Sequence, residues 1–234
     1  MSAQSSPSTL LQSMLDIFIA PSQAFARLNQ TGAHAWILLL QIIVVTAVFY
    51  WFYAGMSPQW LIEQQVLMAG DLSPAETEQM RSAMAQTAEY MAIIGSVSVA
   101  LMTLVITAIT AGYLHLVTRL SGDFAYQDWF GFTVWSQMPL LLNSAGLLVI
   151  TLLATSADLP LSTPSFASLN QLLLQLPLNH AFYTWAETLN MFYLWQIVLV
   201  TLGLKQWCQF STGKALLLAS LPTLLIYGIW AAVI

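Results

Sequence analysis

The sequence predicts an all-α protein: a polytopic transmembrane bundle of five helices, with interfacial helices at the N-terminus and on the outer side. Of its 234 residues, 58% are hydrophobic and only 6% are charged, whereas soluble domains carry about 25% charged residues. Five apolar stretches contain no Lys, Arg, Asp or Glu, and each is near the roughly 20 residues that cross hydrocarbon as a helix. These stretches are residues 35–53, 91–117, 130–155, 188–204 and 215–234.

The chain divides into three parts. Residues 1–8 are small and polar, which favours a disordered N-terminus. Residues 9–30 form an amphipathic interfacial segment, because Leu11, Leu15 and Phe18 recur at helical spacing opposite polar residues. Pro21 ends this helix, and one further turn places Arg27 among lipid headgroups. Residues 31–234 hold the five-helix transmembrane domain.

The first connection predicts a helix outside the membrane. Ser73 and Glu76 have the spacing of a capping box, and Pro74 suits the first helical position. The sequence leaves open whether this helix, residues 74–89, extends the second span or binds something outside the membrane. The second span has about 27 apolar residues, or about 40 Å of helix, so it must tilt or project from the bilayer.

The later connections contain further signals. Residues 119–129 form a short turn, and Pro139 predicts a kink inside the third span because it frees a carbonyl near Trp135. The third connection, residues 156–187, places Leu169, Leu172, Leu173 and Leu176 on one helical face. This pattern predicts a second interfacial helix on the outer side.

The orientation follows from the basic residues in the short connections. With the N-terminus in the cytoplasm, Arg27, Arg119, Lys205 and Lys214 all face the cytoplasm, and only Arg81 faces outward. Basic residues gather on the cytoplasmic side of membrane proteins. Five crossings then predict a cytoplasmic N-terminus and a C-terminus on the outer side.

Several function classes are disfavoured. The chain has no basic patch, so we expect no nucleic-acid partner. Cys208 is the only cysteine, and three isolated histidines lack ligand spacing, so we expect no metal and no cofactor. No acid–base pair or catalytic motif is present, so we expect no enzyme activity. The absence of acids within the spans argues against ion-coupled transport.

Several short motifs occur in order along the chain: P-S-Q-A-F at 21–25, G-D-F at 122–124, S-Q-M-P at 136–139, an F-Y-L-W pattern with a G-L exit at 192–204, and the entry to the last span at 211–215. In these motifs the chain resembles the Yip1 family, in its bacterial branch. An acidic element typical of eukaryotic members is missing, so their role in vesicle traffic is not carried over. The resemblance implies a bacterial inner-membrane protein, whose outer side is the periplasm, with an unsettled biochemical role.

The leading functional hypothesis is a non-catalytic scaffold or adaptor. It would engage membrane lipids, another membrane protein or a second copy of itself through its cytoplasmic face, where the motifs and most basic residues gather. His115 is either a titrating group that binds an anionic headgroup or an interfacial anchor. The candidate residues are Pro21, Phe25, Arg27, His115, Arg119, Gly122, Asp123, Phe124 and Pro139.

The alternative is a passive channel or facilitator for a small or uncharged solute. Thr107, Asn143 and Asn190 would line its path, since uncharged polar groups suit passive flow. The competing interpretation is structural: such residues commonly join helices, and Asn143 should face the bundle interior and bond a neighbouring element. An enzyme acting on lipids is a third, weaker possibility.

Overall fold

The computed structural model describes residues 10–28 and 34–234. The predicted disordered residues 1–8 lie outside this part of the chain. The described residues are helical and contain no strand beyond one isolated bridge, Ser168 with Asn190. The α-helices are α1 Leu10–Ile19, α2 Pro21–Arg27, α3 His34–Ala54, α4 Pro58–Met68, α5 Pro74–Ala85, α6 Met91–Thr118, α7 Tyr126–Ser136, α8 Pro139–Leu153, α9 Tyr183–Thr188, α10 Met191–Cys208 and α11 Thr212–Val233. Short helical turns are η2 Ala88–Tyr90, η3 Thr163–Ser165 and the π-helix η4 Asn170–Leu174.

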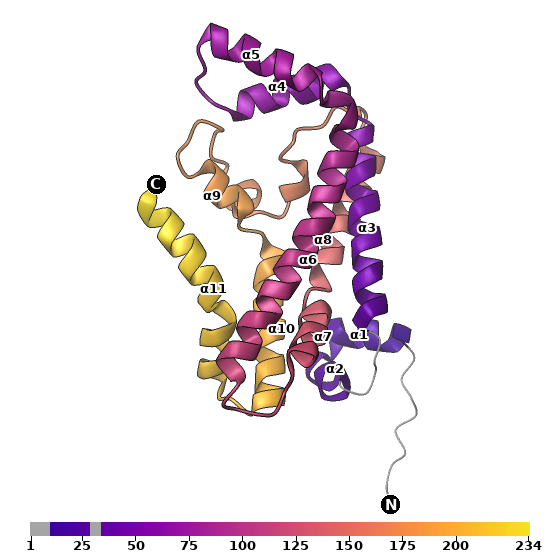
Figure 1. Cartoon of the computed structure of the whole chain (residues 1–234), viewed down its shortest axis with the longest axis vertical. Helices are drawn as coiled ribbons and strands as arrows, with labels where there is room; N and C mark the ends of the chain where they lie inside the picture. The colour runs from indigo at the N-terminus through magenta and orange to yellow at the C-terminus, as the bar shows by residue number, and fades with distance from the viewer. Residues whose placement is uncertain (1–9, 29–33) are drawn as a thin grey trace, which may run out of the picture.

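The helices form an elongated bundle with two distinct ends (Figure 1). Helices α1 and α2 lie at one end, with the α6–α7 and α10–α11 connections, and we call this the N-terminal end. Helices α4 and α5 cover the opposite end, called the α4–α5 end. Helix α3 packs against α6 and α8, and α10 packs against α11, α2 and α8. Helix α11 leans away from the bundle toward its C-terminus.

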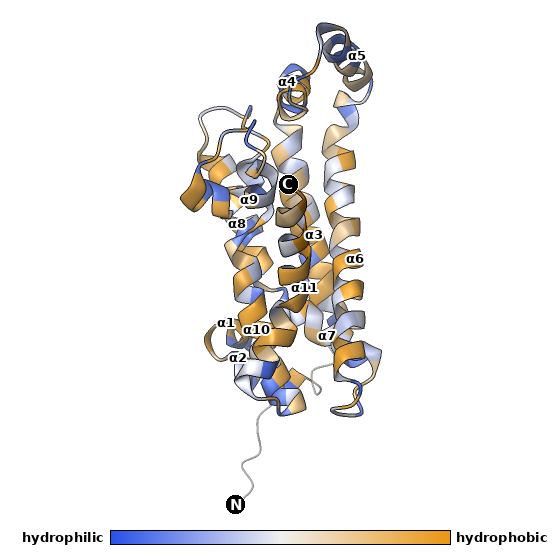
Figure 2. Cartoon of the chain, turned by 90° about the vertical axis from the view of Figure 1, so that its left-hand side faces the viewer, coloured by the Kyte–Doolittle hydropathy of each residue, from blue (hydrophilic) through white to orange (hydrophobic). Residues whose placement is uncertain are grey.

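Four helical segments are long and apolar enough to cross a membrane. They are His34–Ala54, Ala88–Thr118, Tyr126–Leu153 and Thr212–Val233. Hydrophobic residues run along these helices, while hydrophilic ones concentrate at α5 and at the connections of the N-terminal end (Figure 2). The all-helical, multi-pass membrane architecture is therefore confirmed.

The fourth predicted span, residues 188–204, corresponds to α10, which is not among these four segments. Helix α10 has 18 residues and includes Gln196, Lys205 and Gln206, which lower its mean hydropathy. The structure thus supports four crossings by length and composition.

The N-terminal segment folds as two helices that meet at Pro21. Helix α1 ends at Ile19 and Pro21 occupies the first turn of α2, as the sequence predicts. Ile17 is fully buried in the bundle, whereas Leu11 and Leu15 are exposed. Arg27 closes the pair of helices through a 2.6 Å ion pair with Asp16. The segment is therefore docked on the bundle by one face.

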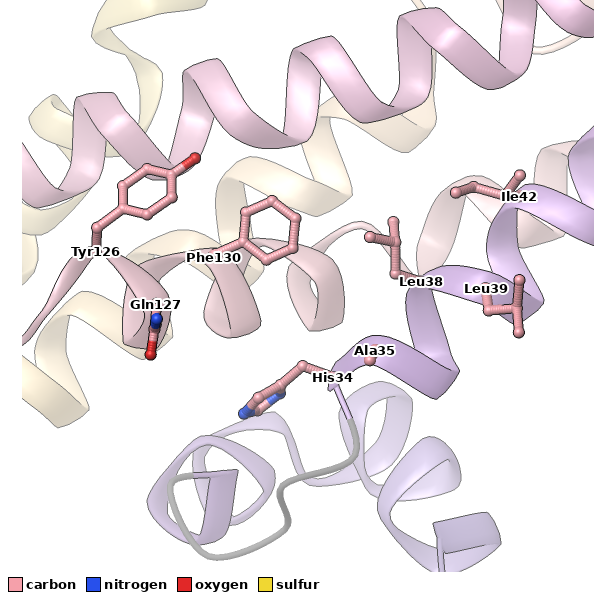
Figure 3. A pocket seen from close by; sticks show the side chains of 8 residues that line it. All are labelled: His34, Ala35, Leu38, Leu39, Ile42, Tyr126, Gln127 and Phe130. Carbon is pink, nitrogen blue, oxygen red and sulfur yellow. The ribbon is translucent and has the colours of Figure 1, made fainter.

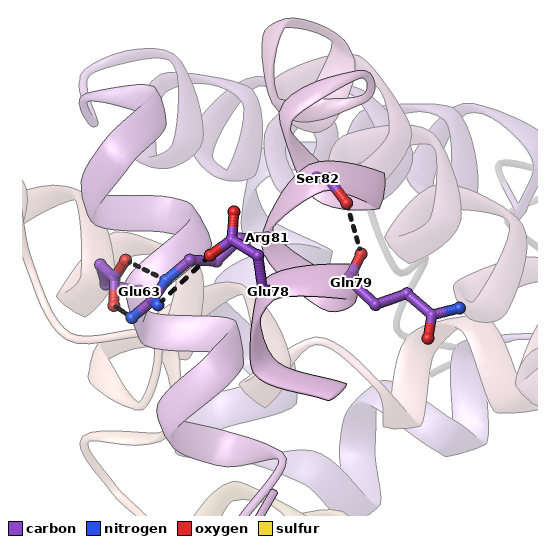
Figure 4. Close-up of polar contacts among 5 residues, drawn as sticks. All are labelled: Glu63, Glu78, Gln79, Arg81 and Ser82. Carbon is purple, nitrogen blue, oxygen red and sulfur yellow. Dashed lines mark hydrogen bonds and ion pairs between the residues drawn. The ribbon is translucent and has the colours of Figure 1, made fainter. Parts of the chain in front are cut away.

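The α4–α5 end is built from a hairpin of two polar helices. Ser73 and Glu76 form the predicted capping box at the start of α5. Arg81 makes two hydrogen bonds to the Glu63 carboxylate, at 2.8 and 2.9 Å (Figure 4). The hydrogen bonds from Arg81 hold the pKa of Glu63 below its usual value. This pair joins α5 to α4.

The helix of the first connection does not continue into the second span. Helix α5 ends at Ala85, and η2 precedes the start of α6 at Met91. The long connection between α8 and α10 also differs from its prediction. Instead of an interfacial α-helix over residues 169–176, the chain forms the five-residue π-helix η4 and then places Gln175 in the left-handed region at φ 49°.

Hydrogen bonds join the two long connections, the one between α3 and α6 and the one between α8 and α10. The Asp158 carboxylate accepts hydrogen bonds from the backbone N–H and the hydroxyl of Ser57, at 2.7 and 3.0 Å. The Trp60 indole donates to the Leu159 carbonyl at 2.9 Å. These contacts join the start of α4 to the chain that follows α8.

Candidate functional site at the N-terminal end

An aromatic cluster lies at the centre of the N-terminal end. We define the aromatic cluster as Phe25, Phe124, Trp129, Phe132 and Trp207. Phe25 stacks on Phe132 with ring centroids 4.7 Å apart, and Phe124 stacks on Trp207 at 5.0 Å. Trp129 lies 5.2–5.7 Å from the rings of Phe124, Phe132 and Trp207. Rings at these separations attract each other beyond their burial.

Four separate segments meet in this aromatic cluster. Phe25 comes from α2, Phe124 from the α6–α7 connection, Trp129 and Phe132 from α7, and Trp207 from α10. The Trp207 indole also donates to the Phe25 carbonyl at 2.9 Å. Phe25, Trp129 and Phe132 are almost completely buried. Phe25 therefore has a packing role. The aromatic cluster as a whole brings together the motif segments at 21–25 and 122–124.

Two glycines allow the close packing around these rings. A Cβ atom at Gly203 would lie 2.1 Å from Cε2 of Phe132, and one at Gly122 would lie 2.8 Å from Cε2 of Phe124. Both distances are shorter than real Cβ atoms tolerate. Gly203 lies on α10 and lets the Phe132 ring lie directly on that helix.

The charged candidate residues of the N-terminal end lie on the segments that form the aromatic cluster or on α11 beside them. Arg27 is held by Asp16 and by the Gln23 carbonyl. Arg119 and Asp123 are exposed. Lys214 is exposed and lies 3.6 Å from the centroid of the Phe210 ring. Within residues 10–28 and 34–234, no carboxylate lies within 4 Å of Arg119, Lys205 or Lys214, so these three cations are uncompensated.

An open apolar groove of about 670 Å³ lies between α3 and α7 (Figure 3). Tyr126 and Phe130 of α7 face Leu38 and Ile42 of α3, and His34 lies where the groove meets the N-terminal end. His34 Nδ1 accepts a hydrogen bond from the Trp135 indole at 3.1 Å, which leaves Nε2 as its donor. The groove has apolar walls and a polar rim that includes Gln127.

His115 lies next to this groove on α6. Its ring meets the edge of Tyr126, a groove residue, with centroids 6.5 Å apart. His115 Nδ1 is buried and has no hydrogen-bond partner among the described residues. His115 thus lies on the α6 side of the groove, and Arg119 follows one turn later, just after the end of α6.

Pro139 breaks the third span as predicted. Helix α7 ends at Ser136 and α8 begins at Pro139. The Trp135 carbonyl accepts a hydrogen bond from the Met138 N–H at 3.2 Å. The side chain of Gln41 donates to the Val134 carbonyl at 2.8 Å and is 3% exposed. Gln41 therefore replaces a helical hydrogen bond at the break, a role that sequence reasoning missed because a lone glutamine in an apolar run carries no signal.

The polar residues considered for a solute path bond to protein groups. Thr107 is fully buried and lies 2.8 Å from Gln137 Oε1 and 2.7 Å from the Thr103 carbonyl. Asn143 donates to the Pro164 carbonyl at 3.2 Å and accepts from Asn190 at 3.1 Å. Asn143 bonds neighbouring elements, as expected, and each of these side chains joins two segments.

Replacing Gln41 tests the polar contact at the break. We expect Gln41→Leu to lower the free energy of unfolding by about 1–3 kcal/mol, because the Val134 carbonyl stays buried without a donor. Denaturation in mixed micelles followed by circular dichroism measures this loss. Gln127→Leu, the same exchange at an exposed position on α7, is the control. Equal stability of both variants would show that water replaces Gln41.

A comparison with protein families identifies the chain. A family model described as the Yip1 domain matches residues 15–233, which is nearly the whole chain. The chain belongs to the Yip1 family. No curated protein and no solved structure matches it. The match begins within α1 and ends within α11, so the N-terminal helices and the bundle together make up this Yip1 domain.

The geometry explains what the Yip1 motifs do in this chain. Pro21 starts α2, Phe25 and Phe124 fill the aromatic cluster, and Pro139 starts α8. Gly122 leaves room for the Phe124 ring. The motif residues of this Yip1 domain are therefore mainly packing residues, and the chemically available groups are the three uncompensated cations and the rim of the groove.

Proposed function

We propose that this Yip1 protein is a non-catalytic membrane scaffold of the bacterial inner membrane. Its N-terminal end engages anionic lipid headgroups or a membrane protein partner in the cytoplasm. The observation that carries the proposal is the group of uncompensated cations, Arg119, Lys205 and Lys214, at the same end as the open groove. Such cations attract anionic lipid surfaces, each by about 1 kcal/mol.

The proposal includes five crossings, with the N-terminus in the cytoplasm and the C-terminus in the periplasm. Helix α10 runs beside α11 and against α7 and α8, which supports counting it as a crossing. Four of the five Lys and Arg residues lie at the N-terminal end and only Arg81 lies on α5. The positive-inside rule then supports the cytoplasmic placement of that end.

Packing supports a scaffold over a passive channel. Trp129, Phe132 and Trp135 are all fully buried within the bundle at the N-terminal end. Thr107 has its hydroxyl group engaged by Gln137 and its own helix. A solute path through this level would have to displace large aromatic side chains that contact several helices.

The buried carboxylate supports the absence of catalysis. Glu187 is the acidic residue that is buried among the described residues. Its two oxygens accept hydrogen bonds from the Asn170 and Gln171 side-chain amides, at 3.0 and 2.9 Å. A carboxylate held in this way has a structural role.

Lipid retention tests the proposal. The protein is extracted with its surrounding membrane into native nanodiscs, and the lipids and proteins that stay bound are measured by native mass spectrometry. We expect enrichment of anionic lipid, and we expect Arg119→Gln, Lys205→Gln and Lys214→Gln each to reduce it about fivefold, since each removes about 1 kcal/mol.

Arg81→Gln is the matched control, because Arg81 lies at the opposite end and is paired with Glu63. Retention of a stoichiometric protein instead of lipid would identify a protein partner. Bulk lipid composition in the wild type, with no bound protein, would refute the scaffold proposal and direct attention to solute flux.

A further inference from the structure

The chain between α8 and α10 turns back along the bundle. Helix α8 runs ten residues beyond Asn143, about 15 Å, before it ends at Leu153. The chain then returns: the Pro164 carbonyl accepts from Asn143, and Asn190, the cap of α10, donates to Asn143. Helix α10 therefore begins at the level of Asn143, about 15 Å closer to the N-terminal end than the last residue of α8.

The point of return lies near the middle of the membrane span. Helix α3 has 21 residues, or about 31 Å, which matches the thickness of the hydrocarbon core. Leu147 of α8 packs with Val48 and Phe52 in the second half of α3. Asn143 lies one helical turn before Leu147, and so about 6 Å closer to the middle of the membrane span.

Close packing keeps the returning chain against α8. A Cβ atom at Gly146 would lie 2.3 Å from the Phe166 ring, so this glycine leaves room for Phe166 on the face of α8. Phe166 in turn meets Phe192 of α10, with ring centroids 6.4 Å apart. The returning chain thus lies between α8 and the first turn of α10.

The irregular backbone of this segment has its polar groups satisfied by protein. The Leu169 N–H donates to Leu189 and the Met191 N–H donates to Ala167, at 2.7 and 2.9 Å. The Leu176 N–H donates to the Asn170 side chain, whose amide is held by the buried Glu187. Irregular chain at membrane depth is stable only when its groups are satisfied in this way.

The same segment exposes three consecutive leucines. Leu172, Leu173 and Leu174 are 51%, 74% and 45% exposed, and Leu178 is 42% exposed. The π-helix η4 places the three leucines outside while Asn170 is buried on the inner side. A patch of this kind suits hydrocarbon and would be unfavourable in water.

We propose that residues 154–190 form a re-entrant element that enters the bilayer from the α4–α5 end. Its leucines contact the acyl chains of the leaflet on that side, and it completes the crossing that α10 starts. This assignment explains how the chain reaches the α4–α5 side of the membrane although α10 begins near the middle of the span. It is independent of the headgroup binding proposed above and of which side of the membrane is cytoplasmic.

Cysteine reactivity tests the proposal. Leu173→Cys and, separately, Leu172→Cys are made in a Cys208→Ala background, and the protein is placed in nanodiscs of neutral phospholipid, which expose both faces. Maleimides react with thiolates, which form in water and not in hydrocarbon. We therefore expect both cysteines to be labelled at least roughly tenfold more slowly than Met68→Cys. Met68, at the end of α4, is 56% exposed and is the matched control.

A nitroxide attached at position 173 gives a second measurement. Oxygen, which concentrates in hydrocarbon, should relax the label more strongly than a water-soluble nickel chelate, with the reverse order at position 68. Labelling of both leucine positions as fast as position 68, or stronger relaxation by nickel, would overturn the proposal. Neither result depends on anionic lipid, so the scaffold proposal can fail or stand separately.

Discussion

Trp129→Ala is expected to lower the free energy of unfolding by about 4 kcal/mol, because it opens a cavity in the aromatic cluster. Trp129 is fully buried and contacts three other rings of the aromatic cluster. Its removal leaves a cavity between α7, α10 and the α6–α7 connection. These segments cannot close the cavity without losing their contacts with other helices. Denaturation in mixed micelles, followed by far-ultraviolet circular dichroism, measures the loss.

Trp36→Ala is the control for this experiment. Trp36 begins the first span and is 69% exposed. Its replacement removes the same side chain without opening a cavity, so the stability in micelles should change little. If the two variants lose equal stability, the aromatic cluster is not what holds the N-terminal end together.

Gly203→Val is expected to lower the free energy of unfolding by about 3 kcal/mol, at the upper end of the usual range for overpacking. The new Cβ would lie 2.1 Å from the Phe132 ring, which is itself stacked on Phe25 and cannot swing away. Helix α10 must therefore move outward from α7. The same denaturation measurement applies, and the Trp207 hydrogen bond to the Phe25 carbonyl should weaken with it.

Gly228→Val provides the comparison for Gly203. It makes the same exchange within α11, where a Cβ meets no atom within 4 Å. The general cost of valine in a helix is the same in both variants. The difference between their losses of unfolding free energy therefore measures the clash with Phe132. A smaller loss at Gly203 than at Gly228 would contradict the packing seen around that ring.

Local signals in the sequence were enough to predict much of the fold. Apolar length predicts the four spans that the structure supports, and the breaks at Pro21 and Pro139 follow from a missing N–H that any helix must accommodate. The capping box of Ser73 and Glu76 was predicted because both partners lie within one turn. The family itself was recognised from short motifs, and the domain match confirms it.

Long-range pairings could not be predicted in the same way. The motifs around Phe25 and Phe124 are about a hundred residues apart, and nothing local indicates that Trp207 joins them. Gln41 supplies a donor to a carbonyl on α7, so its role exists only after the helices pack. The regular leucine spacing at 169–176 predicts an α-helix, but Glu187 accepts hydrogen bonds from Asn170 and Gln171 and holds this segment in another form.

The contact of Asp158 with Ser57 has a consequence for local unfolding. It binds the first turn of α4 to the chain after α8, and that chain is bonded in turn to the start of α10, because the Met191 N–H donates to the Ala167 carbonyl. Segments that share such bonds open together, because releasing one leaves the other with unsatisfied groups. The α4–α5 hairpin and the chain before α10 should therefore exchange their amide hydrogens as one cooperative unit, although about a hundred residues separate them.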